Sequence, residues 1–132
     1  WAYCPGPVAD ALNRLRGPFS VSSLAQAAGV AALADTAFFN RCRTNNDIWR
    51  PWTANKLRGL GLTVPPSAGN FKLVRFPGNG GKTAEAADAF LKARGLIVRA
   101  MGAYGLDDSL RVTIGREEEM TAFIDAMTDF MS

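Results

Sequence analysis

Histidine is absent from this sequence of 132 residues. That removes the side chain that most often acts as a general base near neutral pH and the commonest metal ligand, so we expect no metal site. Only two cysteines are present, Cys4 and Cys42, which are too few for the disulfide framework of a small secreted domain. We therefore expect two ordinary buried or half-buried thiols and a reducing compartment, the cytoplasm. No apolar run reaches the length of a membrane-spanning helix, so we expect no membrane partner.

The excess of positive over negative charge is also small. Fifteen basic and twelve acidic residues give a net charge of +3, which is too little to argue for nucleic acid or an anionic membrane as a partner. Apolar residues make up 48% of the chain, enough for a packed core. The length suits a single domain over residues 1–132. Because the sequence opens abruptly on Trp1 without an initiator methionine, we expect a piece of a longer protein.

The first half of the sequence reads as helices, over residues 7–16, from a serine at about residue 22 to residue 35, and over residues 36–60. Alanine dominates the second helix, which favours close packing against neighbours on more than one side. Pro51 falls inside the third helix and predicts a kink or a break there, since proline removes one backbone hydrogen bond.

The second half predicts a sheet with helices packed on it. Strands are expected over residues 71–76, 96–99 and 109–114, and helices over residues 83–94 and along the Met- and Phe-rich C-terminus. The last strand alternates strictly: Leu110, Val112 and Ile114 share one face, whereas Ser109, Arg111 and Thr113 share the other. Helices followed by a small sheet with helices on it indicate an α+β fold.

A glycine-rich segment after the first strand resembles a phosphate-binding loop. Residues 78–83 read Gly-Asn-Gly-Gly-Lys-Thr. A P-loop needs a glycine five residues before its Gly-Lys pair, where this sequence has Phe76. A flexible turn from strand to helix is therefore the preferred interpretation, with nucleotide binding as the alternative.

Arg99 and Arg111 each lie in a predicted strand of an otherwise apolar region. One interpretation is two solvated surface arginines. The other is an anion-binding pair, because a guanidinium binds carboxylate or phosphate through two parallel hydrogen bonds. The residues alone leave both interpretations open, and they do not show whether the two side chains converge.

Aromatic and basic residues also occur together near the middle of the chain, which has Trp49 and Trp52 close to Arg41, Arg43 and Arg50. Such a mixture can bind nucleic acid. On a helix it is more often a core stripe beside a charged stripe, which is the interpretation we prefer. No catalytic constellation appears, so composition and spacing alone predict an α+β domain with a candidate anion site.

Several segments, in order, resemble histidinol-phosphate aminotransferases. They are residues 12–21, residues 25–28, Pro-Ser-Ala-Gly-Asn-Phe at 66–71, and a specific block that runs from Gly-Leu-Ile-Val-Arg at 95–99 through Gly-Ala-Tyr-Gly-Leu at 102–106 to Leu-Arg-Val-Thr-Ile-Gly at 110–115. The resemblance covers essentially the whole chain. It implies the C-terminal small domain of a fold-type I enzyme, with N-terminal helices and a small, mostly antiparallel three-stranded sheet carrying helices.

The resemblance also implies chemistry. Such enzymes are homodimers that use pyridoxal 5'-phosphate to exchange an amino group between histidinol phosphate, or an aromatic amino acid, and 2-oxoglutarate. By the family pattern Arg111 binds the anionic group of the substrate, Arg99 matches a second arginine near the phosphate end, and Asn70 lies close by. No lysine of this chain matches the one that forms the Schiff base with the cofactor. We therefore expect no catalytic or cofactor-binding residue here and a chain inactive without its large domain. The alternative is a stand-alone binding or interaction domain derived from an aminotransferase.

Overall fold

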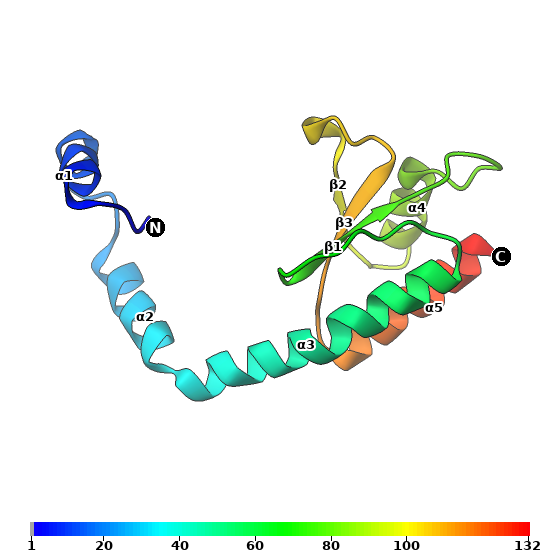
Figure 1. The fold of residues 1–132 in the computed structure, drawn as a ribbon, viewed down its shortest axis with the longest axis horizontal. Helices are drawn as coiled ribbons and strands as arrows, with labels where there is room; N and C mark the ends of the chain where they lie inside the picture. Colours follow the sequence, from blue (N-terminus) through cyan, green and yellow to red (C-terminus); the bar gives the residue numbers. More distant parts are fainter. Residues whose placement is uncertain (1) are drawn as a thin grey trace. The chain divides into compact units, whose positions relative to one another are not determined.

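The computed structural model describes residues 2–132, so Trp1, on which the expectation of a longer protein partly rests, lies outside the described residues. Contacts divide the chain into two compact units, Trp1–Phe39 and Asn40–Ser132. Figure 1 shows the elements of both. Among residues 2–132, no helix is long and apolar enough to cross a membrane.

The first unit holds helices α1 (Gly6–Leu15) and α2 (Ser23–Ala34). Proline near the start of α1 suits a position where the backbone N–H has no helical partner. The hydroxyl of Ser22 accepts a hydrogen bond from the Ala25 N–H at 3.2 Å and caps α2. Within residues 2–132 no side chain of α2 is buried, so the prediction that this alanine-rich helix packs on several sides is wrong for this chain.

Helix α3 (Thr36–Gly59) runs through Pro51 without interruption. The sequence predicts a kink or a break at Pro51, and the break is wrong. Proline removes one backbone donor, whereas the hydrogen bonds on either side remain, and the turn that follows is held by the buried residues Thr53, Ala54 and Leu57. The helix ends as Leu62 N–H donates to the Leu57 carbonyl at 3.2 Å and Gly61 adopts φ +82°.

The sheet of the second unit has three antiparallel strands in the order β1–β3–β2. Strand β1 spans Phe71–Arg75, β2 spans Arg99–Ala100 and β3 spans Ser109–Thr113, with a short 3₁₀ turn, η1 (Gly102–Tyr104), between the last two. The predicted α+β architecture is confirmed. The second strand begins later than the predicted residue 96, because Leu96 N–H donates to the Leu91 carbonyl and closes the preceding helix instead.

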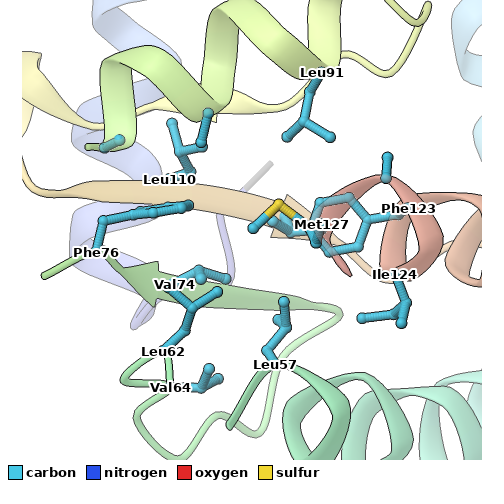
Figure 2. Close-up of a cluster of buried hydrophobic side chains, with 14 of the residues drawn as sticks. Leu57, Leu62, Val64, Val74, Phe76, Leu91, Leu110, Phe123, Ile124 and Met127 are labelled. Carbon is cyan, nitrogen blue, oxygen red and sulfur yellow. The ribbon is translucent and has the colours of Figure 1, made fainter. Parts of the chain in front are cut away.

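Two helices complete the unit, α4 (Ala84–Lys92), capped by the Thr83 hydroxyl, and α5 (Glu117–Met131). The three acidic residues of the first α5 turn suit the positive end of the helix dipole. Figure 2 shows apolar side chains from the helices and the sheet meeting in one core. Its most deeply buried large members are Leu57, Val74, Leu91, Leu110 and Met127. The predicted C-terminal helix is confirmed, and its apolar side chains belong to this core.

Two side chains depart from their expected burial. Cys4 is half-buried as predicted, but Cys42 is exposed. Lys72 is only 5% exposed and lies in register opposite Val112, on the core face of β1. Burial lowers the pKa of Lys72, and the positive charges of Arg50 and Arg58 lower it further.

Candidate functional site

The candidate site lies on the face of the sheet opposite the core. Strand β3 buries Leu110 and Val112, and Ile114 directly after it is also buried, whereas Arg111 is half-buried and Thr113 is exposed. The predicted alternation therefore holds for these five residues. Ser109 departs from it, because the turn that precedes β3 covers this residue and its N–H donates to the Leu106 carbonyl at 3.1 Å.

Arg99 and Arg111 are direct partners in the β2–β3 register. Directly opposed residues of antiparallel strands have Cβ atoms about 5 Å apart on the same face of the sheet. Leu73 of β1 lies opposite Arg111 from the other side, so the three residues form one row across the sheet. The structure thus brings together the two arginines that the sequence left unplaced relative to each other.

Each guanidinium rests near an aromatic ring. The Arg111 guanidinium carbon lies 5.3 Å from the ring centroid of Phe71, and that of Arg99 lies 5.5 Å from the ring centroid of Tyr104. An Nη2 of Arg99 also donates to the Tyr104 hydroxyl at 3.1 Å. The Nε of Arg111 is buried and finds no hydrogen-bond acceptor among residues 2–132. A buried donor without a partner is costly unless a ligand accepts its hydrogen bond.

Asn70 lies immediately before β1, at the edge of this face. Its carbonyl accepts a hydrogen bond from the Ile114 N–H at 2.8 Å, which extends the pairing of β1 with β3 by one residue. The backbone of Asn70 therefore lies at the end of β1, next to Phe71, and the residue is exposed.

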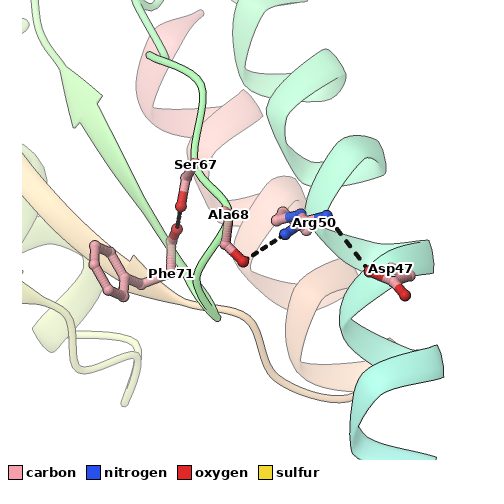
Figure 3. Close-up of polar contacts among 5 residues, drawn as sticks. All are labelled: Asp47, Arg50, Ser67, Ala68 and Phe71. Atoms are coloured by element: carbon pink, nitrogen blue, oxygen red, sulfur yellow. Dashed lines mark hydrogen bonds and ion pairs between the residues drawn. The ribbon is translucent and has the colours of Figure 1, made fainter.

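The loop that leads into β1 is tied to helix α3 (Figure 3). The Arg50 Nη1 donates to the Ala68 carbonyl at 2.7 Å, and its Nη2 lies 3.4 Å from an Asp47 carboxylate oxygen. The Ser67 hydroxyl donates to the Phe71 carbonyl at 2.7 Å. These bonds fix where β1 begins and so position the ring that lies beside Arg111.

The same contacts account for the tryptophan and arginine cluster. Trp49 and Trp52 are half-buried and meet edge to face, with ring centroids 4.9 Å apart. Arg50 is held by the loop and by Asp47. This is the mixture of packing and surface side chains that the preferred interpretation of the sequence describes.

The glycine-rich segment forms the predicted turn from strand to helix, with positive φ at Gly78, Gly80 and Gly81. Its polar residues have structural roles. The Lys82 ammonium donates to the Phe130 carbonyl near the end of α5, and the Thr83 hydroxyl caps α4 at 3.1 Å from the Ala86 nitrogen. Because both groups are used in these contacts, the geometry does not support nucleotide binding.

The four lysines of the sequence all lie away from the arginine pair. Lys56 lies 5.7 Å from the Trp52 ring centroid, Lys82 contacts Phe130, Lys92 pairs with Asp88 at 2.6 Å, and Lys72 is on the opposite face of the sheet. Among residues 2–132, no group of His, Cys, Asp or Glu side chains could hold a metal ion. The arginine pair therefore offers the charge and the N–H donors that an anion would need, whereas the contacts of the four lysines lie elsewhere.

The chain is similar in sequence to known proteins. The sequence profile of the family described as aminotransferase class I and II matches residues 1–127. The chain is 55% identical over 131 residues to the histidinol-phosphate aminotransferase of Paramagnetospirillum magneticum, covering 99% of this chain and 36% of that protein. It is 54% identical over 131 residues to the enzyme of the same name from Rhodospirillum centenum, with the same coverage of each chain.

A solved structure shows the same fold. The histidinol-phosphate aminotransferase from Sinorhizobium meliloti, crystallised in complex with pyridoxal 5'-phosphate, superposes with a TM-score of 0.81 at 26% identity, over 95% of this chain and 34% of that one. The chain thus spans about a third of the length of the relatives it matches. Because the family profile covers nearly all of the sequence, the chain belongs to the class I and II aminotransferases.

Proposed function

We propose that residues 1–132 form the small, substrate-recognition domain of a pyridoxal-phosphate-dependent aminotransferase that exchanges an amino group between histidinol phosphate and 2-oxoglutarate in histidine biosynthesis. The observation that carries this proposal is the Arg99–Arg111 pair on the open face of the sheet, with the buried Arg111 Nε lacking an acceptor among the described residues. The high identity to proteins named histidinol-phosphate aminotransferase supports the choice of donor.

Arg111 binds the anionic group of the substrate in this proposal. Its guanidinium presents a planar fork to two oxygens of a carboxylate or phosphate, and the Phe71 ring beneath it limits how the plane can turn. Arg99, opposite it on β2, adds a second positive charge, which suits a phosphate better than a carboxylate. Asn70 lies at the end of the same face, where its amide is available to a bound substrate.

The cofactor is held elsewhere in this proposal. Pyridoxal phosphate supplies the electron sink of amino transfer and needs a lysine beside the substrate. The four lysines of this chain do not meet that requirement, since each lies away from the arginine pair. The anchoring lysine and the phosphate-binding groups of the cofactor therefore belong to a large domain that makes up the remaining length of the relatives.

The first unit presents the surface that such a large domain would cover. Its apolar side chains are exposed, among them Leu15 at 83%, Phe19 at 93% and Leu24 at 82%. Large exposed apolar patches often mark interfaces. We propose that the protein's own large domain packs here and that the complete protein is a cytoplasmic homodimer.

The assay that tests the function uses the complete protein that contains this chain, beside the 132-residue chain alone. We expect amino transfer from histidinol phosphate to 2-oxoglutarate by the complete protein and none by the chain. After borohydride reduction and digestion, the pyridoxyl group should lie on a lysine outside residues 1–132. A stoichiometric pyridoxyl group on one of the four lysines of this chain would contradict the proposal. A complete protein without amino transfer would favour the alternative of a non-catalytic binding domain.

A further inference from the structure

Tyr104 lies in the turn that joins the two strands of the arginine pair. It ends η1, in which the Tyr104 N–H donates to the Met101 carbonyl at 2.9 Å and the Gly105 N–H donates to the Gly102 carbonyl at 2.8 Å. Gly105 continues the turn with φ +70°, a conformation that side chains with a Cβ rarely adopt. The turn therefore has a defined shape, and this shape places the Tyr104 ring and hydroxyl beside the Arg99 guanidinium.

The arginine pair needs such a partner. Like charges directly opposite each other on neighbouring strands destabilise a sheet, so each guanidinium gains by turning away from the other when no anion is bound. Arg111 is restrained by the Phe71 ring and by burial of its Nε. Arg99 is an exposed residue at a short strand, and no carboxylate pairs with its side chain among residues 2–132. Its hydrogen bond to the Tyr104 hydroxyl is the contact that restrains it.

We propose that Tyr104 is a positioning residue of the anion site: its hydroxyl holds the Arg99 guanidinium on the face where Arg111 lies, so that both arginines meet one doubly charged phosphate group. The inference rests on the proposed function and deepens it. Tyr104 acts through Arg99, because the hydroxyl accepts one of the five guanidinium N–H groups and leaves the others for the anion. The side chain thereby favours a phosphate-bearing substrate over one with a single carboxylate at this position.

The test is a titration of the whole 132-residue chain with inorganic phosphate, followed by nuclear magnetic resonance of the Arg99 and Arg111 side-chain N–H groups. Tyr104→Phe removes the hydroxyl and keeps the ring. We expect it to weaken phosphate binding about 3- to 10-fold, the effect of having to order one mobile side chain on binding. The Arg99 resonance should move toward that of a freely rotating guanidinium before phosphate is added. Tyr3→Phe, at the other tyrosine of the chain, 96% exposed and in the first unit, is the matched control and should bind as wild type.

A second pair of variants separates positioning from a general structural role. In an Arg99→Gln background, Tyr104→Phe should change phosphate affinity by less than about 2-fold, because its effect passes through Arg99. An equal loss in both backgrounds overturns the inference, and so does a Tyr104→Phe chain that binds phosphate as wild type while Arg111→Gln weakens binding. If neither Arg111→Gln nor Arg99→Gln changes phosphate affinity, the proposed anion site is wrong, and the positioning role of Tyr104 is wrong as well.

Discussion

Arg111→Ala in the complete protein is expected to lower kcat/KM by roughly 10²-fold or more with both the amino donor and 2-oxoglutarate. A hydrogen bond to a charged group contributes about 1.5–3 kcal/mol, and a two-pronged arginine contact loses two of them. Each 1.36 kcal/mol changes a rate by about tenfold. Arg111→Lys should fall between wild type and Arg111→Ala, because an ammonium keeps the charge but not the planar fork. Steady-state kinetics of both half-reactions measures the effect.

The matched control for this prediction is Arg94→Ala. Arg94 follows α4 and stacks on Phe90, with its guanidinium carbon 3.5 Å from the ring centroid, away from the arginine pair. Its loss should leave kcat/KM nearly unchanged. Thermal melting of each variant shows whether the protein is still folded. If Arg111→Ala keeps the wild-type kcat/KM, Arg111 is a surface arginine without a role in substrate binding. If activity falls only in proportion to the folded fraction of the protein, the role of Arg111 is structural.

Leu57→Ala is expected to lower the free energy of unfolding by about 2–5 kcal/mol, the range for leucine-to-alanine changes in packed cores. Leu57 is completely buried and projects from α3 into the core between the helices and β1 (Figure 2). Truncating it leaves a cavity at the point where α3 meets the rest of the second unit. Denaturant unfolding of the chain measures the loss, which is large against the total stability of a domain of this size.

Ile97→Ala is the control for the core substitution. Ile97 belongs to the same unit and is 75% exposed, so its truncation should cost less than about 0.5 kcal/mol. If the two variants unfold alike, the Leu57 side chain does not hold α3 against the rest of the second unit, which would contradict this prediction.

Much of the fold could be predicted because its signals are local. Thr83 caps α4, Gly61 follows α3, and strict alternation along residues 110–114 separates the buried from the open face of β3. Lys72 could not be predicted, since a lysine in a strand usually marks the solvated face, and here it lies on the core face near Arg50 and Arg58. The continuity of α3 through Pro51 also depends on tertiary packing.

The candidate site is harder to predict, because it depends on which residues of the neighbouring strands β2 and β3 lie opposite each other. The residue types in β2 and β3 indicate an anion pair, but only the pairing of Arg99 with Arg111 shows that the two lie side by side. That pairing is set by the turn between the strands, whose shape rests on Gly105 and on the hydrogen bonds around η1. The rings of Phe71 and Tyr104 were missed for the same reason, although both belong to the segments that carry the family resemblance.

The measurement that tests the anion site most directly is a crystal structure of the complete protein with histidinol phosphate bound. We expect guanidinium nitrogens of both Arg99 and Arg111 within about 3.2 Å of the phosphate oxygens, the limit for a well-formed hydrogen bond. The Arg111 Nε, which has no acceptor among the described residues, should be satisfied by the substrate or by a water bound to it. A substrate phosphate held by other residues, with both arginines turned to solvent, would contradict the account.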